Sequence, residues 1–112
     1  MSQRKDKMNP PCVVIATFVP LPGQHETVKS LLLEVAEEVY EEKGCITYAL
    51  HEATNGSLVF IEKWQSRELW QEHSKHKSVE RIKDGVKGLL SEEILVHEMY
   101  GVHNRVSSAA SI

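Results

Sequence analysis

The segment from Gly44 to His76 constrains the fold more than any other part of the chain, because a helix end, a hairpin and a helix start follow one another with almost no residues between them. Lys43-Gly44 is typical of a helix C-terminus with the glycine in the left-handed conformation. Asn55-Gly56, between two runs of β-branched and aromatic residues, predicts a two-residue hairpin turn. Ser66 fits the N-cap of the next helix.

The turn also sets the pairing of the two hairpin strands. With a two-residue turn at Asn55-Gly56, Leu50 faces Ile61. Because side chains alternate between the faces of a strand, one face then carries Ile46, Tyr48, Leu50, Val59 and Ile61, and the other carries Thr47, Ala49, His51, Phe60, Glu62 and Trp64. Neither face is simply polar, so we expect both to be covered. Two helices cover one face of a small sheet, and a second copy of the chain is the simplest cover for the other.

The first part of the chain supplies a strand and a helix. Residues 1–11 are polar and end in two prolines, and we expect a flexible leader there. Residues 12–18 are continuously apolar and rich in β-branched side chains, which predicts a buried strand. Apolar residues at helical spacing predict a helix over 25–43. Its many glutamates are interpreted as a solvated face: Glu34, Glu37, Glu38, Glu41 and Glu42.

The last part of the chain supplies a helix and a strand. Helical periodicity follows Ser66, and Ser78 is a second N-cap candidate within it. The final strand is expected over 94–102. The order strand, helix, strand, strand, helix, strand predicts a ferredoxin-like α+β fold, with a four-stranded antiparallel sheet and both helices on one face. We expect this single domain to cover 12–103, followed by a tail over 104–112.

Composition and charge exclude several classes of protein. The formal net charge is −3 and no cluster of lysine and arginine is present, so we expect no nucleic-acid partner. No apolar run approaches the ~18 residues of a membrane span, and the N-terminus lacks the apolar core of a signal peptide. We therefore expect a cytoplasmic protein without membrane contact. Cys12 and Cys45 are expected to be buried thiols rather than a disulfide or a metal site.

Four short motifs give the chain a resemblance to a known family. They are Pro22-Gly23-Gln24, Gly44-Cys45-x-x-Tyr48, Glu62-x-Trp64, and His73 nine residues after the tryptophan. In this order and spacing, over residues 12–102, they resemble the antibiotic biosynthesis monooxygenase (ABM) family, most closely its quinol monooxygenase group. The resemblance implies a dimeric α+β barrel, in which the sheets of two subunits pack face to face, with a cavity between sheet and helices. It also implies that O2 oxidises a small quinol or phenolic aromatic without any metal, flavin or haem cofactor.

The sequence departs from two patterns found among such relatives. Haem-degrading members use an asparagine, a tryptophan and a histidine, whereas the corresponding positions here carry Ala16, His73 and Lys83. Haem degradation is therefore not expected. Many relatives also have a Pro-His pair five residues beyond the helical histidine, but here His76 follows His73 after three residues and no proline precedes it.

His73 is the candidate catalytic residue. An oxygenase without a cofactor must deprotonate its phenol or quinol, because the anion passes an electron to O2 far more readily than the neutral molecule does. A neutral imidazole suits that role of general base. The alternative is a structural histidine that bonds to the backbone or to a dimer partner.

The other candidates are aromatic or polar residues near His73. Tyr48, Trp70 and His76 are candidate substrate-binding residues, although aromatic side chains of a hairpin and a helix often serve the core instead. The predicted register places His51, Glu62 and Trp64 on one strand face, which we assign mainly to the dimer interface, with a supporting role for Glu62 behind an imidazole as the alternative. The histidine spacing and the lack of a carboxylate-histidine cluster do not favour a metal site.

Two functions from different classes therefore remain open. The first is a cofactor-independent monooxygenase with His73 as base. The second is a dimeric α+β barrel domain that binds, isomerises or detoxifies a small reactive metabolite without acting as an oxygenase, because one fold can host several chemistries. A closed cavity that contains His73 would favour the enzyme, and a site filled by aromatic side chains and leucines would favour the second function.

Overall fold

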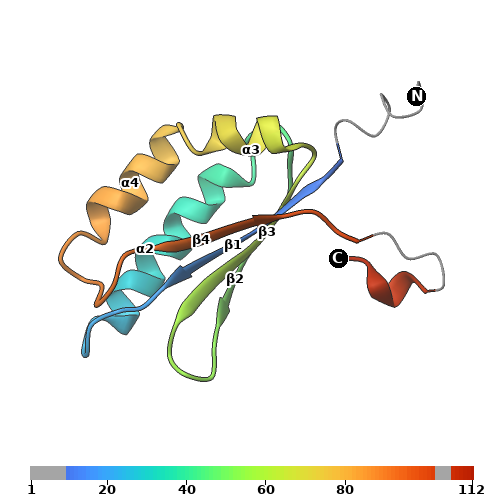
Figure 1. The fold of residues 1–112 in the computed structure, drawn as a ribbon. Helices are drawn as coiled ribbons and strands as arrows, with labels where there is room; N and C mark the ends of the chain where they lie inside the picture. The colour runs from blue at the N-terminus through green and yellow to red at the C-terminus, as the bar shows by residue number, and fades with distance from the viewer. Residues whose placement is uncertain (1–9, 103–106) are drawn as a thin grey trace.

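A computed structural model describes residues 10–102 and 107–112, and in it one sheet is covered on one face by helices (Figure 1). The chain runs through β1 (Cys12–Phe18), α2 (His25–Val39), β2 (Cys45–Glu52), β3 (Leu58–Trp64), α3 (Arg67–His73), α4 (Lys77–Gly85), β4 (Leu95–Met99) and the short 3-10 helix η1 (Ser108–Ala110). The strands form an antiparallel sheet in the order β2-β3-β1-β4. This confirms the ferredoxin-like α+β fold, with the first strand central and the second at an edge.

Several predicted boundaries change in the structure. The first helix ends at Val39 rather than at residue 43, and the second helical region divides into α3 and α4. The Ser66 hydroxyl accepts a hydrogen bond from the Leu69 amide at 3.2 Å, which confirms Ser66 as an N-cap. Ser78 is not a cap, because α4 begins one residue earlier with His76 at the N-cap position. Most of the predicted leader, and residues 103–106, lie outside the described residues.

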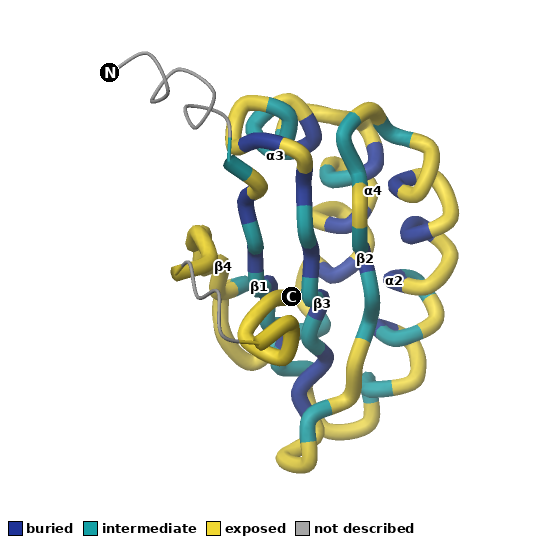
Figure 2. The backbone as a smooth tube through the Cα atoms, turned by 90° about the vertical axis from the view of Figure 1, so that its right-hand side faces the viewer, coloured by how far each residue is buried: buried dark blue, intermediate teal, exposed yellow. Residues whose placement is uncertain are grey.

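The core lies between the sheet and the helices. Residues of β1 alternate between buried and half-buried, and Cys12, Val14, Ala16 and Phe18 face the helices (Figure 2). The buried stripe of α2 packs against them: Val28, Leu32, Val35, Ala36 and Val39. Both cysteines are free thiols, and each pairs across the sheet with Trp64 of the intervening strand β3, as expected for strands that are not neighbours. None of the helices in the described part is long and apolar enough to cross a membrane.

The predicted hairpin register is wrong by one residue. The turn is formed by Ala53 to Gly56, with the Gly56 amide donating to the Ala53 carbonyl at 2.9 Å. The Asn55 side chain accepts from the Ser57 amide at 2.9 Å, and Gly56 has a φ of 94°. The loop is therefore a three-residue connection with glycine in the left-handed position, the next commonest hairpin type after the two-residue turn.

This change of register moves Phe60, Glu62 and Trp64 to the face of the hairpin that carries Tyr48 and Leu50. Tyr48 now faces Glu62, and Leu50 faces Phe60, while an irregularity between Cys45 and Thr47 places Cys45 opposite Trp64. Because a one-residue slip exchanges the two faces of a strand relative to its partner, Glu62 now shares the helix-covered face with Tyr48.

The connection from α2 to β2 is fixed by Gly44. Its φ is 87°, as the sequence predicts, and a Cβ atom there would lie 2.7 Å from the Leu69 Cδ1 atom of α3. The Gly44 carbonyl also accepts a hydrogen bond from the Gln65 amide at 2.9 Å. Only glycine allows both this conformation and the close approach of α3. The turn between Val39 and Gly44 is thereby held beside the start of α3 and α4.

Candidate active site

The described residues bring His73 together with a glutamate that the sequence analysis had assigned to solvent. The Nδ1 atom of His73, the last residue of α3, lies 2.7 Å from Oε1 of Glu42, in the turn after α2. Both side chains are almost fully buried, with 5% and 8% of their surface exposed. A neutral imidazole donates from only one nitrogen, so this contact assigns the proton to Nδ1 and leaves Nε2 as an acceptor.

The second carboxylate oxygen of Glu42 is also occupied. The Ser78 hydroxyl donates to Oε2 at 2.6 Å, and Nδ1 of His76 lies 3.8 Å from the same oxygen. His76 is half exposed and lies at the edge of an open groove of about 430 Å³. The groove is lined by Glu38, Glu42, Lys75, His76, Lys77 and Ser78. Glu42 therefore connects the buried His73 with a surface groove that does not itself include His73.

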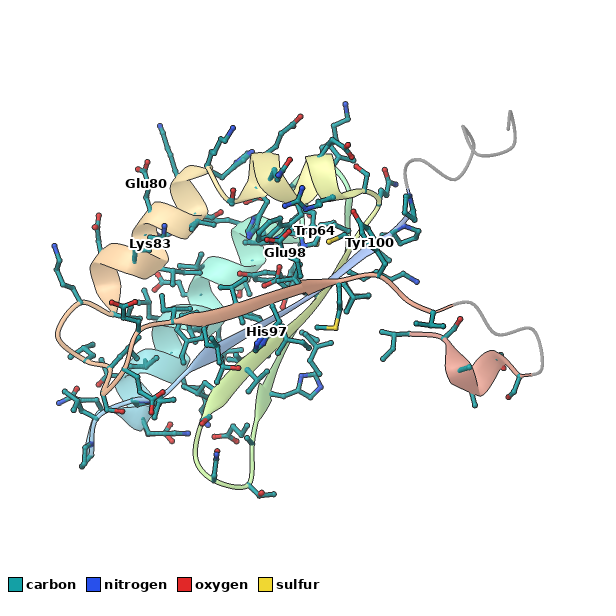
Figure 3. All side chains as sticks on the ribbon, in the orientation of Figure 1. Trp64, Glu80, Lys83, His97, Glu98 and Tyr100 are labelled. Atoms are coloured by element: carbon teal, nitrogen blue, oxygen red, sulfur yellow. The ribbon has the colours of Figure 1, made fainter. Side chains whose placement is uncertain are left out.

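Aromatic rings cover the other side of the His73 imidazole. Trp64 stacks on it with ring centroids 4.5 Å apart, and Tyr48 approaches edge-on at 5.6 Å. Tyr48 in turn stacks on Phe60 at 4.2 Å. Trp64 lies between the sheet and the helices (Figure 3). These buried rings pack against the imidazole and against one another, and none of them lines the groove beside Glu42.

Glu62 and Trp64 do not share a face with His51, which corrects the predicted arrangement. Both are buried on the helix-covered face, where the Trp64 indole N–H donates to the Glu62 carboxylate at 2.9 Å. His51 is exposed, and its Nδ1 lies 3.0 Å from the carbonyl of Ala49 in its own strand. The physical reason is the one-residue change of register, which turns Glu62 and Trp64 toward His73.

Burial sets the protonation of the site residues. It lowers the pKa of His73, although the hydrogen bond and negative charge of Glu42 act in the opposite direction. It raises the pKa of Tyr48, so the phenol stays neutral and can donate a hydrogen bond. It also raises the pKa of Glu62 from 4.5 to about 7, opposed by the Trp64 hydrogen bond and reinforced by the charge of Glu42. At neutral pH the site therefore contains a neutral base, a neutral phenol and a carboxyl group close to its titration midpoint.

The raised pKa of Glu62 predicts a pH-dependent contribution to stability. Between pH 4.5 and about 7 the folded carboxyl keeps a proton that the unfolded chain has released. This contribution is fully present below pH 4.5 and is lost as the pH rises to about 7, with a total of about 3 kcal/mol. Because glutamine does not titrate, the stability of the wild type relative to Glu62→Gln should fall by about that amount over this range, as measured by urea unfolding at several pH values.

The matched control is Glu72→Gln, which changes an exposed glutamate on α3. Its pH dependence of stability should match that of the wild type. Parallel pH curves for Glu62→Gln and the wild type would show that the buried carboxyl has an ordinary pKa, and the prediction would be wrong.

The remaining candidates lie in different environments. Trp70 of α3 is half-buried against the core, and His76 is a surface residue at the α4 N-cap. Glu42 and Ser78 were not among the predicted site residues, although the sequence contains a signal for Glu42. Residues 35, 39 and 42 continue one helical stripe, so the glutamate occupies a core-facing position of the repeat.

One group of side chains of the types that bind metal ions occurs within the described residues, away from His73. His25, Glu26 and Glu52 have ligand atoms within 4.8 Å of one another, but Lys29 already lies 3.3 Å from the Glu52 carboxylate. His25 and the two glutamates are at the surface, and an ammonium group beside them takes the place that a cation would occupy. The arrangement does not favour a metal centre.

Solved structures share this fold over most of their length. Rv0793 from Mycobacterium tuberculosis is 28% identical with a TM-score of 0.77, over 87% of this chain and 99% of its own. PA3566 from Pseudomonas aeruginosa is 24% identical with the same TM-score, over 86% and 98%, which shows the fold alone. The family profile of antibiotic biosynthesis monooxygenases matches residues 11–85, well over half of the chain. The chain belongs to this family.

Family membership confirms the predicted resemblance to the ABM family as a whole. A solved structure described as an antibiotic biosynthesis monooxygenase is 26% identical to this ABM protein, with a TM-score of 0.76 over 82% of this chain and 99% of its own. No curated protein matches the chain. Membership of the family therefore rests on the profile and the shared fold, and neither of them identifies the reaction.

Proposed function

We propose that this ABM protein is a cofactor-independent monooxygenase that oxidises a small quinol or phenolic aromatic with O2, with His73 as the general base. One observation carries the proposal: the buried Nδ1 of His73 lies 2.7 Å from the Glu42 carboxylate, which leaves Nε2 free to accept a proton. Family membership supports it.

The burial of His73 suits this role. Its lowered pKa keeps the imidazole neutral near neutral pH, so it is ready to take a proton from a substrate hydroxyl. When the imidazolium forms, the adjacent Glu42 carboxylate stabilises its charge. The Tyr48 phenol can donate a hydrogen bond to a substrate oxygen.

The reaction balances without an external reductant. A hydroquinone and one O2 give a hydroxyquinone and one H2O, because the ring supplies all the electrons. His73 accepts the hydroxyl proton, the anion passes one electron to O2, and the resulting radicals combine at a ring carbon. His73 then returns the proton to the peroxide, and loss of water with the hydrogen of that carbon leaves a new carbonyl group.

The test is O2 consumption with a panel of hydroquinones and hydroxylated aromatics, corrected for oxidation in buffer without protein. We expect one O2 consumed per quinol, and one labelled oxygen atom in the product when the reaction is run under 18O2. O2 uptake no faster than in the buffer control would overturn the proposal. Release of one H2O2 per quinol would show that the protein oxidises the quinol without inserting an oxygen atom, and the protein would then be an oxidase.

A second candidate function is favoured by a specific observation. His73 and Tyr48 are only 5% exposed and Trp64 is 0% exposed, so these rings pack against one another. Such packing suits a domain that binds or isomerises a small metabolite without reacting with O2. Ligand-induced stabilisation in a thermal unfolding assay, without O2 uptake for the same compounds, would support this alternative.

We also propose that the open face of the sheet binds a second copy of the chain. Outward side chains of the central strands, such as Ile15 and Ile61, are apolar and half-buried, and Leu95 and Met99 of the edge strand are exposed. A symmetric pairing of two sheets would cover this surface. Light scattering should give twice the chain mass, and Ile61→Lys should reduce it to that of a monomer.

A further inference from the structure

Glu42 stands apart from the other glutamates of its region. Its side chain is 8% exposed, whereas those of Glu34 and Glu38 are 71% and 45% exposed and pair with Arg81. Both oxygens of the Glu42 carboxylate are occupied, one by His73 and one by Ser78. Burial of a carboxylate raises the free energy of the folded state unless hydrogen-bond donors are held in place around it. Here the two donors come from separate elements.

The local fold brings Glu42 to this position. The chain leaves the helix after Val39, and the Glu42 amide donates to the Val39 carbonyl at 2.9 Å. Gly44 then turns the chain into β2 beneath α3. The carboxylate thus lies where α3 ends and α4 begins, within reach of both His73 and Ser78.

We propose that Glu42 is the positioning residue of His73, and that the chain of hydrogen bonds Ser78–Glu42–His73 fixes the proton on Nδ1 so that Nε2 is the base. The catalytic part of this inference rests on the proposed function, whereas the fixed tautomer does not. Among the described residues, His73 makes no hydrogen bond other than that to Glu42, and no fully buried side-chain nitrogen or oxygen lacks a partner. Its Nε2 therefore has no hydrogen-bond partner among these residues and is available to accept a proton.

Other ionisable groups surround the pair. Tyr48 and Cys45 belong to β2, Glu62 belongs to β3, and His76 precedes α4. The charge of Glu42 acts on Tyr48, Cys45 and Glu62, and the charge of His76 acts on His73. Any change at Glu42 must therefore be compared with a neighbouring glutamate that lacks these contacts.

Two substitutions separate the geometry of Glu42 from its charge. In Glu42→Gln the amide oxygen can still accept the Nδ1 proton, but the negative charge is lost. In Glu42→Ala the acceptor itself is lost. The matched control is Glu41→Gln, which changes the adjacent, exposed residue.

The first measurement is the tautomer of His73 by long-range 1H–15N NMR, which requires no activity. Wild type, Glu41→Gln and Glu42→Gln should show a single Nδ1–H tautomer with widely separated nitrogen shifts. Glu42→Ala should show averaged shifts from interchanging tautomers. A fixed Nδ1–H tautomer in Glu42→Ala, or mixed tautomers in the wild type, would overturn the proposal.

The second measurement is the pH profile of quinol oxidation. Glu42→Gln should lower kcat by about 10- to 100-fold, as expected when the partner that orients an imidazole is changed. Because the Glu42 charge raises the pKa of His73, its removal should also move the acidic limb of the profile to lower pH. A normal kcat and an unshifted limb in a folded Glu42→Gln protein would overturn the positioning role.

The two proposals can fail separately. A wild-type protein with a fixed tautomer and no O2 uptake would refute the monooxygenase and leave Glu42 as the residue that orients His73. Robust O2 uptake with tautomers unaffected by Glu42→Ala would refute the role of Glu42 and leave the proposed function intact. Glu42→Gln keeps the size and hydrogen-bonding capacity of the site, so its kcat and pH profile test the role of Glu42 if Glu42→Ala fails to fold.

Discussion

Replacing His73 by alanine should lower kcat for quinol oxidation by about 10²- to 10⁴-fold, the usual contribution of a general base. The residual reaction is that of O2 with the small fraction of substrate that ionises without help. The KM should change much less, because a general base acts on the transition state and contributes little to binding of the substrate. Adding a substrate that is already ionised in solution should restore a large part of the rate, since that substrate does not need a base.

The control for this prediction must separate chemistry from folding. His73 is buried against Glu42, so its removal leaves a buried carboxylate with Ser78 as its remaining short hydrogen-bond partner among the described residues. Circular dichroism and urea unfolding should show that the variant is folded at the assay temperature. His25→Ala changes a surface histidine at the start of α2, away from His73, and should retain full activity. Full turnover by folded His73→Ala would eliminate the base assignment.

The order of the elements could be predicted from the sequence because it depends on local signals. The alternation of apolar residues, the glycine at position 44 and the cap at Ser66 each act within a few residues, and the structure contains all three. The boundaries of β1 are those expected. Local signals of this kind determine which element forms, and the topology follows from a small number of allowed connections.

The register of the hairpin could not be predicted in the same way. Asn55-Gly56 is compatible with both a two-residue turn and a three-residue turn with glycine in the left-handed position. The choice is made by the core, because the observed register buries Tyr48, Phe60 and Glu62 beneath the helices. Tertiary packing therefore determines the register. The shift of one residue places Glu62 and Trp64 in the candidate site rather than at the predicted dimer interface.

The role of Glu42 was hidden for a similar reason. A glutamate near the end of a helix is usually solvated, and only the packing of α3 and α4 against the α2 turn gives this one two partners. The break between α3 and α4 was missed as well, and it is this break that places His73 and Ser78 on either side of the carboxylate. Sequence periodicity can indicate that position 42 faces the core, but it cannot identify the residues that contact the side chain there.

The two buried carboxylates contact different rings of one stack. Glu42 contacts His73 directly, whereas Glu62 contacts Trp64, and Trp64 stacks on His73. Trp64 therefore contacts both the hydrophobic core and the candidate base.

Trp64→Ala should lower the free energy of unfolding by about 3–5 kcal/mol, the range for deletion of a large buried aromatic side chain. Trp64 is 0% exposed, pairs across the sheet with both Cys12 and Cys45, and is the hydrogen-bond donor to Glu62. The cavity, the lost stacking on His73 and the unpaired carboxylate all act in the same direction. Because small domains are stable by about 5–15 kcal/mol, the loss should be evident in urea unfolding at 25 °C.

Two further variants distinguish these contributions. Trp64→Phe retains a ring for the stack but removes the indole N–H, so it should cost less than Trp64→Ala. It should also raise the pKa of Glu62, because the Trp64 hydrogen bond lowers that pKa, and the upper end of the pH range over which stability falls should move upward. Trp70→Phe changes a half-buried tryptophan of α3 and should cost about 1 kcal/mol or less. A cost for Trp64→Ala no greater than that for Trp70→Phe would show that the ring stack does not hold the site together.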